Sequence, residues 1–518
     1  MKGNENESLL RKARSAAPLL AILFVSALLR MYGLNKPSFL DEPFSIYVAK
    51  LNPSQIISLI PTDVHPPFYY FVLHYWIVPF GDSEIATRFP SVVFSVLAVF
   101  VLYLIGERLF SREVGLVSAL IAGLSVYQIN LAQDARMYSL LGLLAILSMY
   151  FFIRLKESQT LASSLGYIGF TIASLYTHNY GLFIVIAQNL YVLSLSVILK
   201  DRTFSLKKWF TLQLLLLLLY APWLTVLPSQ VSNTKAYAWI GAPALYSIVV
   251  QFKAYAGSWP LLLILFFAAQ LALFTFNKIQ GEFNQKTPLQ SIAKYRWIVG
   301  IAIDNNVYLT LLWLLVPNVL PFVYSYIGTP IYGSGSTIRF TIIASMALYL
   351  LTAKGISSIK YRPLKLGVIA VIAVLSLASL ASYYAEPNTD IRYRDVAKYI
   401  DENARPGDLV LFFSRPTGDY ITHIELGFDA FSKRTDLTKI SFPSTFYDLS
   451  HEDAASTINA TVHNYSRVWV FNTEPEWDYL LNESVLHSAK TRCQPFGASV
   501  LRPDFQSKVC FFERPTAA

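Results

Sequence analysis

The chain has 518 residues, of which 54% are hydrophobic and 14% are charged, and its mean hydropathy is +0.43. Soluble domains carry about 25% charged residues, so this composition excludes a disordered chain, a coiled coil and a disulfide-stapled mini-protein. It also disfavours an ordinary cytosolic enzyme. The class that it predicts is a polytopic membrane protein.

The net charge of +9 is unevenly distributed along the chain. Residues 1–384 hold 28 Lys and Arg against 14 Asp and Glu, whereas residues 385–518 hold 14 against 19. A basic membrane part followed by a mildly acidic tail is not typical of a nucleic-acid binder. We therefore expect a transmembrane domain over 1–384, a separate domain over 385–518, and no nucleic acid as partner.

Apolar runs of the length needed to cross a bilayer predict about eleven transmembrane helices. They lie near residues 15–34, 89–105, 114–131, 137–153, 160–177, 181–199, 209–228, 258–277, 305–323, 338–353 and 364–384. The ninth is the weakest, because the segment 297–303 could belong to it or lie at the interface.

The Lys and Arg residues between these runs predict the orientation. One set of loops, which includes the N-terminus, carries 20 of them, and the opposite set carries 8 before the tail. The N-terminus is therefore expected in the cytoplasm. The first run lacks a small-residue cleavage site and is expected to be an anchor. An odd number of spans then places residues 385–518 outside the cell membrane.

The tail has the pattern of a small α/β domain. Residues 394–403 are helix-like, residues 405–408 form a turn, and 409–413, 467–471 and 509–512 are typical of strands. Both cysteines, Cys493 and Cys510, lie in this tail. They are expected either to pair in an oxidising compartment or to be two buried thiols.

Polar residues concentrate at span ends and in loops on the outer side, and the first group is Asp41-Glu42. Pro43 follows and suits a first helical turn, so the two carboxylates are expected to begin a helix on the membrane surface. They could simply cap that helix, because acidic residues are favourable at a helix N-terminus. Alternatively, one of them is a general base held where lipid and water meet.

A second group is Asp63-Val64-His65-Pro66-Pro67, in which the prolines stiffen the turn and fix how Asp63 and His65 point. His65 could equally be a structural histidine at the interface.

The third group is the turn Gln133-Asp134-Ala135-Arg136-Met137-Tyr138. Arg136 could extend to the headgroups, or it could hold a phosphate with its planar guanidinium. His178, in Thr177-His178-Asn179, and Arg339, at the start of the tenth span, are weaker signals of the same kind.

These groups resemble a known family. Asp41-Glu42 after the first span, followed by Asp-x-His-Pro-Pro, is similar to the dolichyl-phosphate-mannose protein mannosyltransferases. The run from His65 to Tyr70, the turn from Gln133 to Tyr138 and Thr177-His178 resemble the related lipid A aminoarabinose transferases. Both belong to the GT-C superfamily of polyprenyl-phosphate-dependent glycosyltransferases. The resemblance covers roughly residues 15–200, and Arg339 extends it.

The resemblance implies a GT-C-like fold and an enzyme that moves a sugar, with inversion, from a polyprenyl-phosphate donor to an acceptor on the extracytoplasmic side. The acceptor would be a lipid, a glycan or a protein. Asp41, with Glu42 as the second choice, would be the base, and Arg136, His65 and Arg339 would bind the donor phosphate. Asp63, Tyr138 and His178 would line the acceptor or sugar site.

Two questions stay open at this point. Asp63 and His65 could help to hold a divalent cation, but two ligands are too few to specify one. The alternative function is a transporter or flippase for a lipid-linked sugar, which would need ionisable groups along a path through the membrane. A receptor that works through its tail would not explain the polar groups at the span ends.

Overall fold

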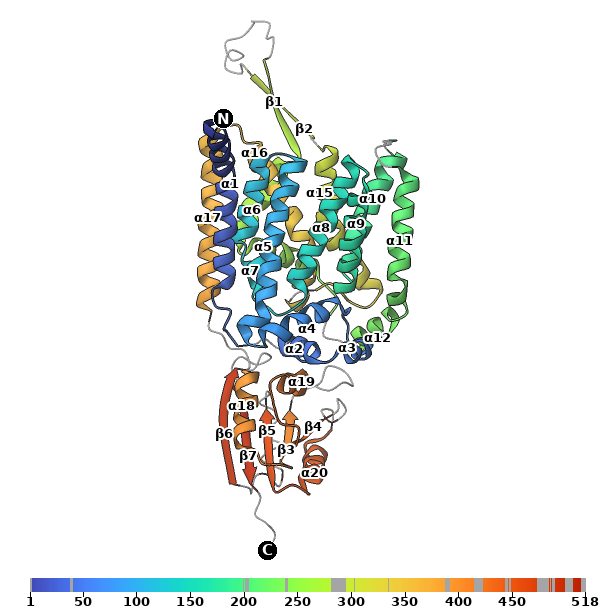
Figure 1. Ribbon diagram of the computed structural model, residues 1–518, viewed down its shortest axis with the longest axis vertical. Coiled ribbons are helices and arrows are strands. Elements are labelled where there is room, and N and C mark those ends of the chain that lie inside the picture. The colour runs from blue at the N-terminus through green and yellow to red at the C-terminus, as the bar shows by residue number, and fades with distance from the viewer. Residues whose placement is uncertain are drawn as a thin grey trace, which may run out of the picture.

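The structure is a computed structural model. It describes residues 2–37, 41–198, 200, 205–237, 241–280, 295–301, 303–333, 335–386, 392–413, 423–442, 446, 449–472, 484, 486, 490–498 and 506–513. A bundle of helices forms one end of the molecule and a small α/β domain forms the other, with the N-terminus at the far end of the bundle from that domain (Figure 1).

The first half of the bundle consists of helices and short turns. They are α1 (Lys2–Met31), α2 (Asp41–Lys50), α3 (Pro53–Leu59), η1 (Ile60–Thr62), α4 (Phe68–Phe80), α5 (Glu84–Leu109), α6 (Arg112–Leu124), α7 (Val126–Ala132), α8 (Tyr138–Glu157), α9 (Leu161–Thr177), α10 (Gly181–Leu193) and η2 (Ser194–Ile198). Helices α2, α3 and α4 lie across the end of the bundle that faces the α/β domain (Figure 1).

The second half adds further helices and a hairpin. They are α11 (Leu206–Leu224), α12 (Leu227–Tyr237), α13 (Leu245–Ala256), α14 (Trp259–Leu271), β1 (Phe274–Gln280), β2 (Tyr295–Ile301), α15 (Asn305–Ile327), η4 (Gly335–Thr341), α16 (Ile342–Ser357) and α17 (Arg362–Ala385). The hairpin of β1 and β2 projects beyond the end of the bundle at which α1 begins (Figure 1). The run predicted as a span over 258–277 thus ends in a strand, and the ambiguous segment 297–303 begins as one.

The predicted class, a polytopic helical membrane protein, is confirmed. Among the described residues, six helices are long and apolar enough to cross a membrane, and up to eight are if each of two bent pairs counts as one span. The prediction of eleven is larger because it also counts α1, α9 and α11. The apolar part of α1 and the 17-residue α9 fall short of the 18 residues that such a helix requires.

The bent pairs are α6 with α7, at 60°, and α13 with α14, at 93°. At the first bend the buried Arg30 of α1 donates to the carbonyls of Ala122 and Gly123, at 3.2 and 2.9 Å. Arg30 also donates to Ser95 Oγ of α5 at 2.8 Å. A buried arginine thus supplies side-chain donors to the backbone at the bend, where regular helical hydrogen bonding is interrupted.

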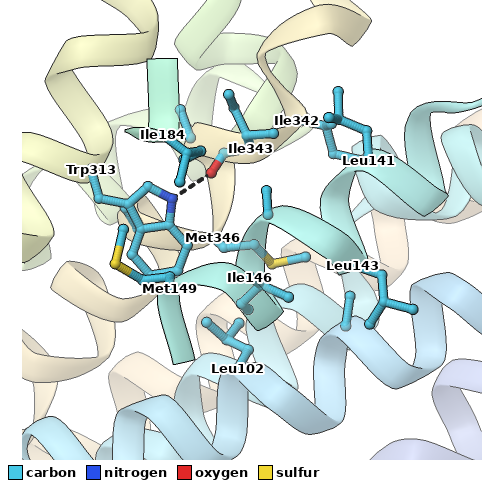
Figure 2. Close-up of a cluster of buried hydrophobic side chains, with 14 of the residues drawn as sticks. Leu102, Leu141, Leu143, Ile146, Met149, Ile184, Trp313, Ile342, Ile343 and Met346 are labelled. Atoms are coloured by element: carbon cyan, nitrogen blue, oxygen red, sulfur yellow. Dashed lines mark hydrogen bonds between the residues drawn. The ribbon is translucent and has the colours of Figure 1, made fainter. Parts of the chain in front are cut away.

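The core of the bundle lies between α5, α8, α10, α15 and α16 (Figure 2). Trp313 of α15 is buried and donates from Nε1 to the carbonyl of Ile343 at 2.6 Å. Met149 and Met346 fill the space between the branched side chains, as flexible thioethers often do. This packing fixes α8 against α16, and each of these helices begins directly after a polar segment of the predicted site.

The α/β domain contains α18 (Tyr393–Asn403), β3 (Leu409–Phe413), α19 (His423–Asp429), β4 (Thr438–Ser441), α20 (His451–Val462), β5 (Arg467–Asn472), β6 (Lys490–Ala498) and β7 (Gln506–Glu513). The sheet has the order β4-β3-β5-β7-β6, with β3 parallel to β4 and β5, and β7 antiparallel to β5 and β6. Two apolar clusters cover its two faces, so β3 and β5 are apolar along their length. Cys493 and Cys510 lie opposite each other on β6 and β7 and form a disulfide. Of the two predicted alternatives, a disulfide or two buried thiols, the structure has the disulfide.

The α/β domain packs on the bundle through α19, which contacts α2. Lys50 at the end of α2 donates to the carbonyl of Ala430 at 2.5 Å, and Arg394 of α18 forms an ion pair with Glu84 at 2.7 Å. The Arg394 guanidinium also lies 4.3 Å from the centre of the Phe431 ring. The helix that begins at Asp41 is therefore held between the bundle and the α/β domain.

Close packing of α14 on α16 generates a test of the fold. A Cβ atom on Gly355 would lie 1.7 Å from the carbonyl oxygen of Ala268, so Gly355→Ala must push two helix backbones apart. We expect it to lower the free energy of unfolding by about 1–3 kcal/mol, measured as thermal unfolding in detergent. Gly367→Ala is the matched control, because no atom lies within 4 Å of a Cβ there. Equal midpoints for the two variants would contradict the packing described.

Candidate active site

Asp41 is the first residue of α2, at the end of the bundle that faces the α/β domain (Figure 1). Its carboxylate forms an ion pair with Arg339, and its backbone carbonyl accepts from Arg136 Nη1 at 3.2 Å. The same nitrogen donates to Ser45 Oγ, one turn along α2, at 2.8 Å. The structure thus brings together three residues that the sequence separates by almost 300 positions.

The two arginines meet because the elements that carry them are packed together. Arg136 lies in the turn between α7 and α8, and Arg339 lies in η4, directly before α16. Tyr127 donates from its hydroxyl to the carbonyl of Ile338 at 2.8 Å, which holds η4 against α7. The Arg339 guanidinium lies 4.9 Å from the centre of the Tyr138 ring, within the range of a cation–π contact.

Several polar atoms at this site are buried without a hydrogen-bond partner among the described residues. They are Nε of Arg136, Nε of Arg339, the hydroxyl of Tyr138 and Nε2 of His178. Buried polar groups are normally satisfied, so a group of them at one place indicates a site that receives a polar ligand. Three of the four atoms are donors, and the fourth, a hydroxyl, can also donate, which favours an anion.

His65 and His178 lie side by side, with ring centres 5.1 Å apart. Nδ1 of His178 accepts from the backbone N–H of Tyr180 at 3.1 Å, so the proton of the neutral ring is on the unpartnered Nε2. Burial, followed by the neighbouring His65, holds the pKa of His178 well below its usual value. His178 is therefore a neutral hydrogen-bond donor at the site.

Asp63 orients this pair and does not face the site freely. Its carboxylate accepts from the backbone N–H of Val64 at 2.7 Å and from the Tyr70 hydroxyl at 2.6 Å, and it lies 3.5 Å from Nδ1 of His65. Burial lowers the pKa of His65, although Asp63 opposes that effect. The stiff turn predicted from the two prolines thus positions His65 through Asp63.

Glu42 is placed differently from its neighbour Asp41. It is buried and forms a two-pronged ion pair with Arg88 of α5, at 2.7 and 2.5 Å. One of its oxygens also accepts from the backbone N–H of Ala135 at 2.7 Å. Because its oxygens are occupied by these donors, the geometry favours Asp41 over Glu42 as a base.

Two residues of this region were not assigned a role from the sequence. Arg88 lies directly before the apolar run 89–105, within α5, where an arginine needs a partner, and this was the signal for its pair with Glu42. Asp134 lies in the turn with Arg136, and its Oδ1 is buried without a partner among the described residues. Burial, followed by the charge of Glu42, raises the pKa of Asp134 to about 7.

Two cavities adjoin this cluster. The first, of about 530 Å³, has apolar walls from α10, α12 and α15, and His65 and His178 lie at its polar part. The second, also of about 530 Å³, is more polar than the first and is lined by Glu42, Asp134 and Arg339 among others. Arg339 lines the second cavity and the next residue, Phe340, lines the first, so η4 separates the two.

The residues do not fit a metal ion. Among the described residues, no group of three or more His, Cys, Asp and Glu side chains is arranged to hold one. Both oxygens of Asp63 already accept hydrogen bonds, and Nδ1 of His178 is occupied as well. The divalent cation considered from Asp63 and His65 is therefore not supported by these side chains.

Comparison with known proteins agrees with the resemblance seen in the sequence. Residues 64–226 match the family described as dolichyl-phosphate-mannose-protein mannosyltransferase. No curated protein sequence matches the chain.

Solved structures extend the likeness to the whole chain. ArnT from Cupriavidus metallidurans is 12% identical, with a TM-score of 0.59 over 97% of this chain and 98% of that one. The same protein bound to undecaprenyl phosphate is 11% identical, with a TM-score of 0.60 over 96% and 98%. The Archaeoglobus fulgidus oligosaccharyltransferase, in complex with Zn and sulfate, is 11% identical, with a TM-score of 0.55 over 90% and 70%.

The family match and the shared fold confirm the resemblance that was seen in the sequence. The chain therefore shares its fold with ArnT, and residues 64–226 match the mannosyltransferase family. The transporter alternative lacks comparable support, because the polar cluster lies at one end of the bundle.

The placement of Glu42 generates a test of its role. Removing one partner of a buried ion pair leaves the other charged and unpaired, so Glu42→Gln should lower the free energy of unfolding by about 3–5 kcal/mol. Replacing both Glu42 and Arg88 by leucine should recover part of the loss.

The control is Glu157→Gln, which breaks the exposed pair with Arg108 and should cost at most about 1 kcal/mol. Thermal unfolding in detergent measures all of these variants. If Glu42→Gln is as stable as the parent but inactive, Glu42 acts in catalysis and the structural role is wrong.

Proposed function

We propose that this enzyme transfers a sugar from a polyprenyl-phosphate donor to a hydroxyl acceptor, with inversion, on the extracytoplasmic side of the membrane. The observation that carries the proposal is the convergence of Asp41, Arg136 and Arg339 beside an apolar cavity. The apolar cavity suits the lipid of such a donor, and the two permanently charged arginines suit its phosphate. The carboxylate is then placed to act at the sugar.

The donor lipid would lie in the first cavity. Its walls include Leu320, Val323 and Ile327 of α15, which suit a prenyl chain, and His65 and His178 form its polar part. The phosphate would lie near the histidines and the arginines, where Nε of Arg136 and Nε2 of His178 have no hydrogen-bond acceptor among the described residues. The structure of ArnT with undecaprenyl phosphate supports a ligand of this class in the shared fold.

In the reaction, the acceptor hydroxyl gives its proton to Asp41 while its oxygen attacks the anomeric carbon. The bond from that carbon to the phosphate oxygen breaks, and the polyprenyl phosphate leaves with the electron pair. Arg136 and Arg339 stabilise the added charge, so the leaving group needs no strong acid. Tyr138, under Arg339, would help to define the sugar site, and Asp63 would act through His65.

In this mechanism Arg339 interacts first with Asp41 and then with the leaving phosphate. Its ion pair with Asp41 favours the ionised form of the carboxylate, which a base requires. Transfer of a proton to Asp41 weakens that pair at the moment when the leaving phosphate gains charge. Arg339 can then turn toward the phosphate, so the two events support each other.

The cytoplasmic N-terminus and the extracytoplasmic α/β domain are also part of the proposal. The 20 Lys and Arg residues on one side, against 8 on the other, support this orientation. The disulfide between Cys493 and Cys510 is in keeping with an oxidising compartment.

The first functional test concerns Asp41. Membranes that contain the enzyme are incubated with a radiolabelled polyprenyl-phosphate sugar, and release of polyprenyl phosphate and labelled product are both measured. Asp41→Asn removes the base but keeps the shape, so transfer should fall at least ~10²-fold while donor binding survives. Asp395→Asn, on an exposed part of α18, is the control. Normal transfer by folded Asp41→Asn would exclude Asp41 as the base.

The second test concerns the donor phosphate. A charge-assisted contact from Arg136 is worth about 1.5–3 kcal/mol, so Arg136→Ala should weaken donor binding by roughly 10- to 150-fold. Arg136→Lys keeps the charge but loses the planar fork, and it should lie between the parent and the alanine variant. Arg392→Ala, at an exposed site, is the control. Unchanged donor affinity in Arg136→Ala would move the phosphate site to His65 or Arg339.

The third test concerns orientation. In a chain whose Cys493 and Cys510 are replaced by serine, Asn464→Cys places one thiol on an exposed turn of the α/β domain. A membrane-impermeant maleimide should label it in intact cells. Lys360→Cys, on the opposite end of the bundle, should be labelled only after lysis. The reverse pattern would place the active site on the cytoplasmic side.

A further inference from the structure

Helix α12 buries a polar side chain where an apolar one would be expected. It lies at the end of the bundle that faces the α/β domain, where it contacts η1 (Figure 1). Gln230 of this helix is 1% exposed, whereas its neighbours Ser229 and Val231 are both exposed. A surface helix normally turns its apolar residues inward, and burial of an amide costs free energy unless the amide is hydrogen-bonded. The inward position of Gln230 therefore depends on what its amide contacts.

The Gln230 amide is hydrogen-bonded to the turn that carries His65. Its Nε2 donates to the backbone carbonyl of His65 at 3.1 Å. Asn179 adds two longer contacts, from Nδ2 to the carbonyl of Val64 at 3.5 Å and to Oε1 of Gln230 at 3.4 Å. The hydroxyl of Tyr220 in α11 donates to Oδ1 of Asn179 at 3.4 Å. Two side-chain amides thus join α11 and α12 to the His65 turn.

The sequence of this turn explains why it needs donors from outside. The two prolines that follow His65 have no N–H, so this part of the turn cannot donate to its own carbonyls. Asp63 acts on the other end of the residue, because its carboxylate lies 3.5 Å from Nδ1 of the His65 ring. Asp63 therefore orients the ring of His65, and Gln230 fixes the backbone from which that ring projects.

Gln230 is also part of the wall of the first cavity. It lines that cavity together with Leu227 and Val231 of the same helix, and His65 and His178 lie at the polar part. In the proposed function this cavity holds the donor lipid, and the donor phosphate lies near the two histidines. A lipid in the cavity would therefore pack on the helix that holds the His65 backbone.

We propose that Gln230 is a positioning residue for the donor phosphate, which acts by holding His65 in place from α12. The inference rests on the proposed function, in which His65 contacts that phosphate. A contact that is already in place before the donor arrives loses less free energy to ordering when the donor binds. Loss of the Gln230 amide should therefore weaken donor binding even though His65, Arg136 and Arg339 are all present.

Equilibrium binding of farnesyl phosphate to the purified enzyme tests the proposal without any transfer. Gln230→Met keeps the length of the side chain but removes the donor, and it should weaken binding about 3- to 10-fold, as loss of one hydrogen bond does. Gln230→Glu should be impaired at least as much, because an ionised carboxylate cannot donate to the His65 carbonyl. With the polyprenyl-phosphate sugar, both variants should raise KM more than they lower kcat.

A double variant distinguishes positioning from a general effect on the fold. If Gln230 acts through His65, Gln230→Met should change the affinity by less than about twofold once His65 is alanine. Gln188→Met is the matched control, because Gln188 is also buried and its Nε2 also donates at 3.1 Å, to Ser148, but it lines neither of the two cavities. It should lower the thermal unfolding midpoint and leave the affinity for farnesyl phosphate unchanged.

Three results would overturn the proposal. They are parent-like binding by folded Gln230→Met, an equal loss of affinity with and without His65, and failure of both Gln230 variants to fold. The last result would mean that the amide serves stability.

The transfer assay separates this role from the proposed function. If the parent binds farnesyl phosphate through Gln230 and His65 but never transfers sugar, the proposed function is wrong and the positioning role stands. If the parent transfers sugar and Gln230→Met does so with an unchanged KM for the donor, the positioning role is wrong and the proposed function stands.

Discussion

The buried ion pair between Glu42 and Arg88 is the constraint on which the site depends. Arg88 also donates to the backbone carbonyls of Leu34, Lys36 and Pro37, and Glu42 also accepts from the backbone of Ala135. One pair thus ties together the segment after α1, the first turn of α2, the helix α5 and the turn before α8. All of the guanidinium nitrogens and both carboxylate oxygens have partners, which is what makes burial of two charges tolerable.

This arrangement gives two adjacent acidic residues different environments. Glu42 is paired with the buried Arg88 and fixes the helix, and Asp41 is paired with Arg339, which lines the second cavity. The α/β domain adds a second constraint from the opposite side, because α19 contacts α2 and Gly427 lies against Pro43. A base that must meet an acceptor within hydrogen-bond distance gains from being held on both sides. The domain is therefore part of the site's support.

The electrostatic character of the site follows from burial at the end of a membrane bundle. Two arginines lie close together there, although their charges repel, because Asp41 and the Tyr138 ring offset part of that repulsion. The unsatisfied donors around them remain costly until an anion arrives. Such preorganised charge acts where water is scarce, so each interaction is stronger than it would be in water. The phosphate of the proposed donor would meet this requirement.

The sequence by itself determined the parts of this protein that depend on local composition. Ten of the eleven apolar runs fall on a helix or a bent pair, and the run 258–277 begins on α14 and ends in β1. Continuous apolar helices are stable in the hydrocarbon core regardless of their neighbours. The strands 409–413, 467–471 and 509–512 were also predicted correctly, since buried strands are apolar along their length. The motifs pointed to Asp41, His65, Arg136, His178 and Arg339, and the structure places them at one end of the bundle around two adjoining cavities.

Only the tertiary structure decided how these residues divide their tasks. The resemblance ranked Asp41 before Glu42, but the physical reason for that order came only from the structure, because it depends on Arg88, which lies 46 positions from Glu42 on another helix. It missed the hairpin of β1 and β2, whose apolar strands look like membrane segments until they pair, and it gave no sign of the polar cavity that Lys253 and Arg339 share. Hydropathy is a sum over neighbours in the chain, whereas charge pairing and cavity shape depend on residues that meet only after the helices have packed.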